Sequence, residues 1–192
     1  MTLDALLVST GVVALAEMGD KTQLLAFILA ARFKNPIPIV LGILIATVLN
    51  HGLAGALGAW ITTTLEPEML RWALGLSFLA MAAWTLIPDH IDDDETTQGN
   101  HLGVFGATLV TFFLAEMGDK TQIATIALSA HYGTPILVVA GTTLGMLIAD
   151  VPAVFVAEQF ADKIPMKWVH RAASSIFAIM GTLTLLKIDQ LF

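Results

Sequence analysis

The chain of 192 residues contains no cysteine, so a metal ion could be held only by oxygen, imidazole or thioether ligands. Charged residues are scarce as well, at 13% of the chain, whereas 56% of the residues are hydrophobic and the mean hydropathy is +0.79. A basic segment ahead of the first apolar run is also missing, since Asp4 stands there, and we expect this run to be retained instead of cleaved as a secretory signal. This composition is too apolar for a soluble domain of this length and predicts a membrane protein.

Proline, glycine and charged residues divide the chain into apolar stretches that are long enough for membrane-spanning helices, which need about 20 residues. Six such stretches lie near residues 4–31, 36–63, 69–88, 102–130, 135–157 and 166–187. A polar segment rich in aspartate, residues 89–101, separates the third stretch from the fourth. The sequence therefore predicts an all-α membrane protein with two three-helix halves, 1–88 and 102–192, joined by an acidic linker.

A nine-residue segment, LAEMGDKTQ, occurs at residues 15–23 and again at 114–122. The same offset of 99 residues relates Pro36 to Pro135, Gly42 to Gly141 and Phe78 to Phe177. Because each half contains an odd number of spans, duplicated halves would have opposite orientations in the membrane. We therefore predict six transmembrane helices arranged as two inverted-topology repeats, an architecture typical of secondary transporters with a binding site midway through the membrane.

The distribution of lysine and arginine predicts the orientation of these spans. One side carries Arg32, Lys34, Lys163, Lys167 and Arg171, and the other carries Arg71 and Lys187. Because the more basic loops remain in the cytoplasm, we expect the acidic linker to be cytoplasmic and both termini to lie outside.

The repeated segment places Glu17, Asp20 and Lys21 inside an apolar stretch, where a continuous helix would bring them onto one face. A charge facing lipid costs about 2.5–3.5 kcal/mol, so these side chains are predicted to face a protein interior or a wet cavity. Together with the second copy, the predicted ion site comprises the possible ligands Glu17, Asp20, Gln23, Glu116, Asp119 and Gln122 and the supporting charges Lys21 and Lys120. Its four carboxylates and two ammonium groups sum to −2, which a divalent, oxygen-seeking cation would neutralise.

Several residues of the repeated segment have alternative interpretations. Thr22 would point away from the acidic face of a continuous helix, and we expect it to bond to its own helix backbone. Gly19 would allow close packing or loosen the helix, and packing is the commoner use of such a glycine. The acids themselves could serve only as polar contacts between helices, but their excess over lysine favours ion binding.

Further polar residues occur in the second span of each half, namely Asn50, His51 and Asp150. Asp150 follows His51 by the repeat offset, so the two should occupy equivalent positions. Histidine titrates near neutral pH, and this pair could carry the protons of a coupled exchange. The alternative is a structural role, with His51 satisfied in the core and Asn50 a contact between helices.

The two copies of EMGDKT, at 17–22 and 116–121, resemble the E-x-G-D-[KR]-[ST] motifs of uncharacterised protein family 0016, over essentially the full chain. This family of membrane cation transporters includes bacterial manganese exporters of the MneA type and Golgi and thylakoid relatives. The resemblance implies export of manganese(II), with calcium as the alternative ion, in exchange for protons. It also implies that Glu17, Asp20, Glu116 and Asp119 bind or relay the ion, and it favours a bacterial plasma membrane.

The sequence therefore predicts a secondary transporter and not an enzyme, with a divalent ion, protons and the lipid bilayer as partners and with no cofactor and no nucleic acid. Two other classes remain open. Paired carboxylates in a bilayer could activate water in an intramembrane enzyme, and a channel would pass cations without a proton gradient.

Overall fold

The computed structural model describes residues 2–87, 103–156 and 166–186, and every regular element in these ranges is a helix. The helices are α1 (Thr2–Glu17), α2 (Lys21–Phe33), α3 (Pro36–Thr64), α4 (Pro67–Trp84), α5 (Gly103–Glu116), α6 (Lys120–Tyr132), α7 (Pro135–Val156) and α8 (Met166–Leu185). The predicted linker 89–101 lies outside the described residues, as do Lys163 and Lys187 of the orientation count.

Several helix ends follow directly from local sequence. Pro36, Pro67 and Pro135 each begin a helix, where the missing backbone N–H of proline costs nothing and its fixed φ is already helical. Lys34 and Gly133 terminate α2 and α6 in the left-handed conformation, with φ of 50° and 63°. These two caps are separated by the same 99 residues as the repeated motifs, so equivalent segments of the two halves end in the same way.

Two of the predicted spans, 4–31 and 102–130, are not continuous helices. In the first motif α1 ends at Glu17 and α2 begins at Lys21, and α5 and α6 are separated in the same way. Gly19 and Gly118 adopt φ of 83° and 78° between these helices, a conformation that glycine reaches without strain. A Cβ on Gly118 would meet no atom within 4 Å, so this glycine breaks the helix and does not serve close packing. The prediction that Glu17, Asp20 and Lys21 share a face of one helix is therefore wrong.

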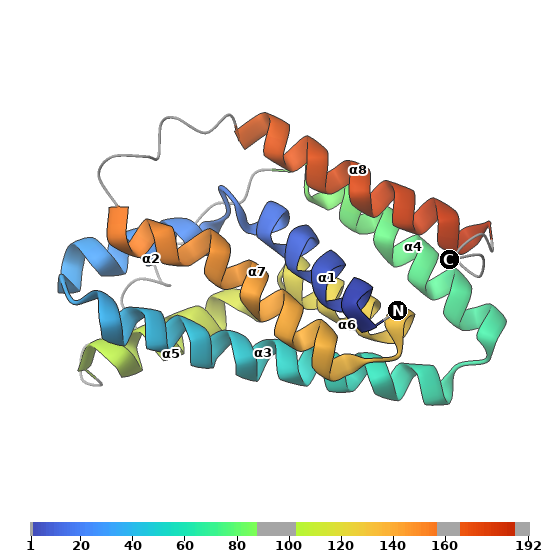
Figure 1. Cartoon of the computed structure of the whole chain (residues 1–192), viewed down its shortest axis with the longest axis horizontal. Coiled ribbons are helices and arrows are strands. Elements are labelled where there is room, and N and C mark those ends of the chain that lie inside the picture. The colour runs from blue at the N-terminus through green and yellow to red at the C-terminus, as the bar shows by residue number, and fades with distance from the viewer. Residues whose placement is uncertain (1, 88–102, 157–165, 187–192) are drawn as a thin grey trace.

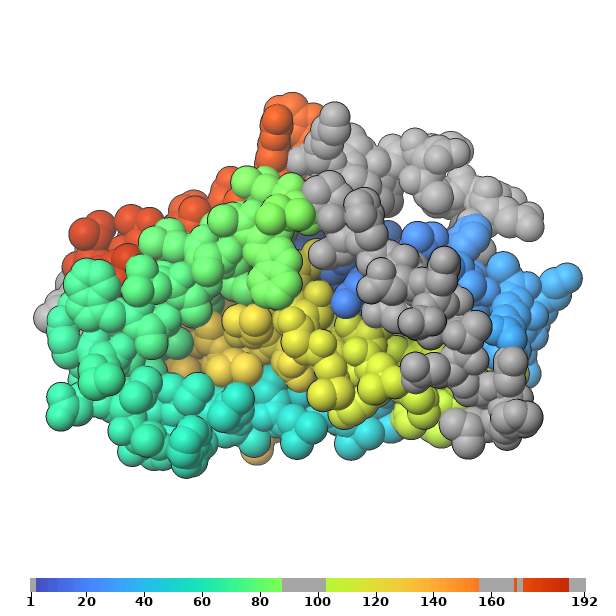
Figure 2. All heavy atoms as spheres, turned by 180° about the vertical axis from the view of Figure 1, so that it is seen from behind, coloured from blue at the N-terminus to red at the C-terminus, as the bar shows by residue number. Residues whose placement is uncertain are grey.

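Helices of the first half, α1–α4, pack between helices of the second half, α5–α8. α1 packs along α7, and α5 packs along α3. Both crossings are close at a glycine, since a Cβ on Gly141 would lie 2.6 Å from the carbonyl oxygen of Leu6, and one on Gly42 would lie 2.7 Å from the Cβ of Thr108. From behind, α6 lies between α4 and α3, and α5 lies further along α3 (Figure 2).

The helices α4 and α8 run side by side along one edge of the bundle (Figure 1). Phe78 of α4 and Phe177 of α8 are fully buried and stack with ring centroids 6.5 Å apart. These two rings are related by the repeat offset and belong to a core that also contains Val12 and Leu128, so the α4–α8 pair is anchored on α1 and α6.

Two helices, α3 and α7, are long and apolar enough to cross a membrane. The outer side of α3 exposes large apolar side chains such as Leu41, Leu49 and Leu53, each at least 47% exposed. The helices next to the motifs are shorter because the motifs interrupt them, with 16 residues in α1 and 13 in α2.

Candidate metal centre

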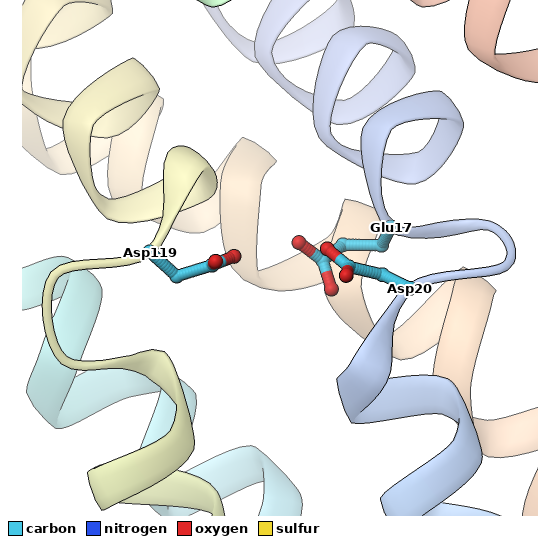
Figure 3. A group of neighbouring side chains, drawn as sticks. All are labelled: Glu17, Asp20 and Asp119. Atoms are coloured by element: carbon cyan, nitrogen blue, oxygen red, sulfur yellow. The ribbon is translucent and has the colours of Figure 1, made fainter. Parts of the chain in front are cut away.

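The two helix breaks bring acids of both motifs together. Glu17 and Asp20, from the α1–α2 break, face Asp119 from the α5–α6 break (Figure 3). One carboxylate oxygen of each lies within 4.8 Å of the others, and the three residues are at most 4% exposed. Oxygens on opposite sides of a bound calcium ion are about 5 Å apart, twice the metal–oxygen distance. The cluster therefore has the chemistry and the dimensions of a site for one hard divalent cation.

A threonine orients each motif glutamate. Thr22 donates a hydrogen bond from Oγ1 to Oε2 of Glu17 at 2.6 Å, and Thr121 does the same for Glu116 at 2.9 Å. The expectation that Thr22 bonds to its own backbone is therefore wrong, because the helix break turns this side chain back toward the acid. In each glutamate the other oxygen, Oε1, is buried and has no hydrogen-bond partner among the described residues. The arrangement leaves that oxygen available to a cation.

The motif glutamines close the breaks and link them to the long helices. The amide oxygen of Gln23 accepts a hydrogen bond from the backbone N–H of Gly19 at 3.0 Å, and its Nε2 donates to the carbonyl of Ala149 at 2.8 Å. Gln122 accepts from Gly118 at 2.8 Å and donates to the side-chain oxygen of Asn50 at 2.8 Å. Both amide oxygens thus support the break, and their role as metal ligands stays a prediction.

The motif lysines reach across to the opposite motif. Nζ of Lys120 lies 2.7 Å from Oδ2 of Asp20, and Nζ of Lys21 lies 3.8 Å from Oδ1 of Asp119. Each copy of the motif therefore supplies the counter-charge of the other.

The polar residues of the long helices lie at the same site. His51 of α3 is fully buried, with Nε2 3.8 Å from Oε2 of Glu116. Asp150 of α7 is also fully buried, and it is close enough to Glu17 and Glu116 for electrostatic interaction. Neither carboxylate oxygen of Asp150 has a hydrogen-bond partner among the described residues. Asn50, next to His51 in α3, is fully buried and also donates weakly from Nδ2 to the carbonyl of Phe113 at 3.5 Å.

Four helix ends converge on this cluster. The C-terminal ends of α1 and α5 carry the partial negative charge of unsatisfied carbonyls, which favours a cation. The N-terminal ends of α2 and α6 carry the opposite partial charge, and Asp20 and Asp119 stand at those N-cap positions. The positive helix ends therefore stabilise the ionised acids, and the acids direct their charge toward the common centre.

Comparison with known proteins agrees with this chemistry. The model of the divalent cation/proton antiporter GDT1 family matches residues 5–93 and 104–190. The chain belongs to this family. The two matched segments each include one motif and the helices around it.

Curated relatives of the chain come from bacteria and plants. A protein of Vibrio cholerae, named "Putative manganese exporter", is 46% identical over 183 residues, which cover 95% of this chain and 90% of that protein. GDT1-like protein 3 of Oryza sativa is 29% identical over 91% of this chain and 71% of its own length, and a GDT1-like protein of Synechocystis is 28% identical over 79% and 84%. No solved structure matches the chain.

Sequence reasoning missed two features of the site. The sequence did not predict that Thr22 and Thr121 orient the motif glutamates. A threonine five residues after a glutamate can reach its carboxylate here only because the helix is broken between them. The hydrogen bond from Gln23 to the carbonyl of Ala149 could not be predicted either, because it depends on packing between segments that are far apart in the sequence. The glycine at the third position of each motif was the available signal for the first feature.

Proposed function

We propose that the protein exports manganese(II) across a bacterial plasma membrane in exchange for protons, with calcium as the alternative ion. The observation that carries this proposal is the buried group of carboxylate oxygens from both motifs, within 4.8 Å of one another. Membership of a divalent cation/proton antiporter family supports the ion class and the counter-ion. The name of the Vibrio cholerae relative supports manganese and the direction of transport.

In the proposed arrangement the chain crosses the membrane six times, as two three-helix repeats of opposite orientation. The interrupted pairs α1–α2 and α5–α6 are each one crossing, and α3, α4, α7 and α8 are the others. Broken helices that meet midway through the membrane are a recurring site design in inverted-repeat transporters, which supports this arrangement. Both termini lie outside and the acidic linker 89–101 lies in the cytoplasm.

In the proposed cycle, Glu17, Asp20, Glu116 and Asp119 capture the ion from the cytoplasm after releasing protons there. Rocking of the two halves then exposes the ion outside, where protons discharge the acids and expel it. Asn50, His51 and Asp150 line the same centre and support proton coupling. Each elementary charge that crosses the membrane is worth about 2.3 kcal/mol per 100 mV. Manganese(II) carries two charges outward, so the membrane potential drives export only when more than two protons enter per ion, and otherwise the proton concentration gradient drives it.

The experiment that tests this function is manganese export in cells and in vesicles. A manganese-sensitive bacterial strain that lacks its exporter should grow in manganese when it produces this protein. The variants Asp20→Asn and Asp119→Asn should not rescue growth, because each removes a charge from the cluster. Glu66→Gln, the same chemical change at an exposed position, should rescue growth like the wild type.

Purified protein in proteoliposomes should then move manganese only when a pH gradient is imposed. Transport of calcium in place of manganese would identify the alternative ion. Passage of cations without any dependence on the pH gradient would indicate a channel, and rescue by both asparagine variants at normal expression would remove these acids from the mechanism.

A further inference from the structure

The two motif lysines occupy equivalent sequence positions but different surroundings. The side chain of Lys120 is 1% exposed and makes a direct ion pair with Asp20, at 2.7 Å. The side chain of Lys21 is 18% exposed and stands 3.8 Å from Asp119. Of these two lysine–aspartate ion pairs, the one made by Lys120 is therefore tight and dry, and the one made by Lys21 is loose and reaches solvent.

Asp20 belongs both to the tight ion pair and to the acid cluster. Its Oδ1 accepts a hydrogen bond from the backbone N–H of Lys21 at 2.7 Å, which fixes the carboxylate at the start of α2. Its Oδ2 is bound by Lys120. The same carboxylate contributes an oxygen to the group formed with Glu17 and Asp119. The ammonium of Lys120 therefore stands beside the position that a transported cation would take.

An ammonium and a divalent cation cannot share this carboxylate without strong repulsion, because the site is buried and charges are poorly screened there. A cation that binds Asp20 must weaken the Lys120 ion pair or push the ammonium aside. Lys21 competes less with a cation for Asp119, since its ammonium is more distant from that carboxylate and its side chain is partly solvated.

We propose that Lys120 is a built-in competing cation, which holds Asp20 when no ion is bound and which the transported ion must displace. This inference rests on the proposed function, because it requires a divalent cation at the acid cluster. Lys120 also connects the second half of the chain to the first through Asp20. Displacement by the ion then releases a contact between the halves, so ion binding and the movement of the halves are coupled through one side chain.

The test is equilibrium binding of manganese(II) to the purified full chain, by titration calorimetry at one fixed pH, for variants of each lysine. Lys120→Met keeps the length of the side chain but removes the charge, so manganese should bind about tenfold tighter or more, since one repelling charge next to the ion is gone. Exchange in proteoliposomes should become slower, because the ammonium no longer competes with the ion for Asp20 while protons discharge the acids. A merely structural role would weaken both binding and transport.

Matched variants separate charge from position. Lys120→Gln can still donate to Asp20 without a charge and should show the same tightening, which covers the case in which Lys120→Met does not fold. Lys120→Arg keeps the charge and should bind close to the wild type. Lys21→Met should shift the Kd less than Lys120→Met, and Lys34→Met, at an exposed helix end, should leave it unchanged.

The outcomes distinguish this inference from the function on which it rests. Absence of manganese and calcium binding by the wild type would overturn both. Binding by the wild type with no tightening in Lys120→Met and Lys120→Gln would overturn the competing-cation role alone. Equal tightening in Lys21→Met would show that only the total charge matters, and would also overturn it.

Discussion

Removal of the hydrogen bond from Thr22 to Glu17 tests whether this threonine positions the carboxylate for a metal ion. Both side chains are fully buried, and the hydroxyl holds Oε2 of the carboxylate at 2.6 Å while Oε1 has no hydrogen-bond partner among the described residues. Thr22→Val keeps the shape of the side chain and removes only the hydroxyl. The acid would then lose the contact that fixes its orientation, without any change in the charge of the site.

The expected magnitude follows from the strength of that bond. A hydrogen bond to a charged group contributes about 1.5–3 kcal/mol, and loss of a partner that orients a metal ligand typically costs about 10–100-fold in metal affinity. We therefore expect the Kd for manganese(II) of Thr22→Val to rise by about 10–100-fold. Titration calorimetry on purified protein measures this directly, and size-exclusion chromatography reports whether the variant is folded.

Three further variants test whether the hydroxyl of Thr22 orients Glu17. Thr22→Ser retains the hydroxyl and should bind nearly as well as the wild type. Thr121→Val should have a smaller effect, because its partner Glu116 lies outside the group of three carboxylates that are within 4.8 Å. Thr63→Val, at an exposed position, should have none. Wild-type affinity in Thr22→Val, or a loss in Thr22→Ser as large as in Thr22→Val, would refute the orienting role.

Two other predictions concern stability and are measured by thermal unfolding in detergent. Gly118→Ala should cost only about 1–2 kcal/mol, since the left-handed conformation is strained for alanine but its Cβ has open space. Gly58→Ala should lower the Tm more, because its Cβ would overlap the carbonyl oxygen of Ile126 and push α3 away from α6; a milder effect than Gly118→Ala would contradict this. Phe78→Ala and Phe177→Ala should each cost about 3–5 kcal/mol, because each leaves a cavity in a fully buried core. An unchanged Tm in both phenylalanine variants would mean that the α4–α8 pair is not anchored by these rings.

Much of the helical layout could be predicted from the sequence, because proline and charge punctuate it locally. The predicted stretch 36–63 corresponds to α3 (Pro36–Thr64), and 135–157 to α7 (Pro135–Val156). The helix breaks could not be predicted from periodicity, because a single glycine is tolerated inside a helix and Glu17, Met18 and Lys21 around it are good helix formers. Only the combination of Gly19 in the left-handed conformation with Asp20 as the next helix cap produces the break.

The composition of the site was also easier to predict than its geometry. Repetition of the motif and the excess of acid over lysine indicate that Glu17, Asp20 and Asp119 gather at one centre, and the structure brings them together. The unequal burial of Lys21 and Lys120 could not be predicted, since the two lie in identical local sequences. The surrounding helices are related by the repeat but differ in side chains, as at His51 and Asp150.

The geometry explains why the motif occurs twice. Within one copy, glycine ends the first helix, aspartate begins the second, threonine orients the glutamate and glutamine closes the break. Lysine acts across the two copies, because Lys120 pairs with Asp20 and Nζ of Lys21 lies 3.8 Å from Oδ1 of Asp119. A single copy would therefore lack the ion pair that the other copy supplies to its aspartate, and burial of an unpaired carboxylate is costly. The two copies complete one another, so the site exists only where the halves meet, and any movement of one half against the other must change it.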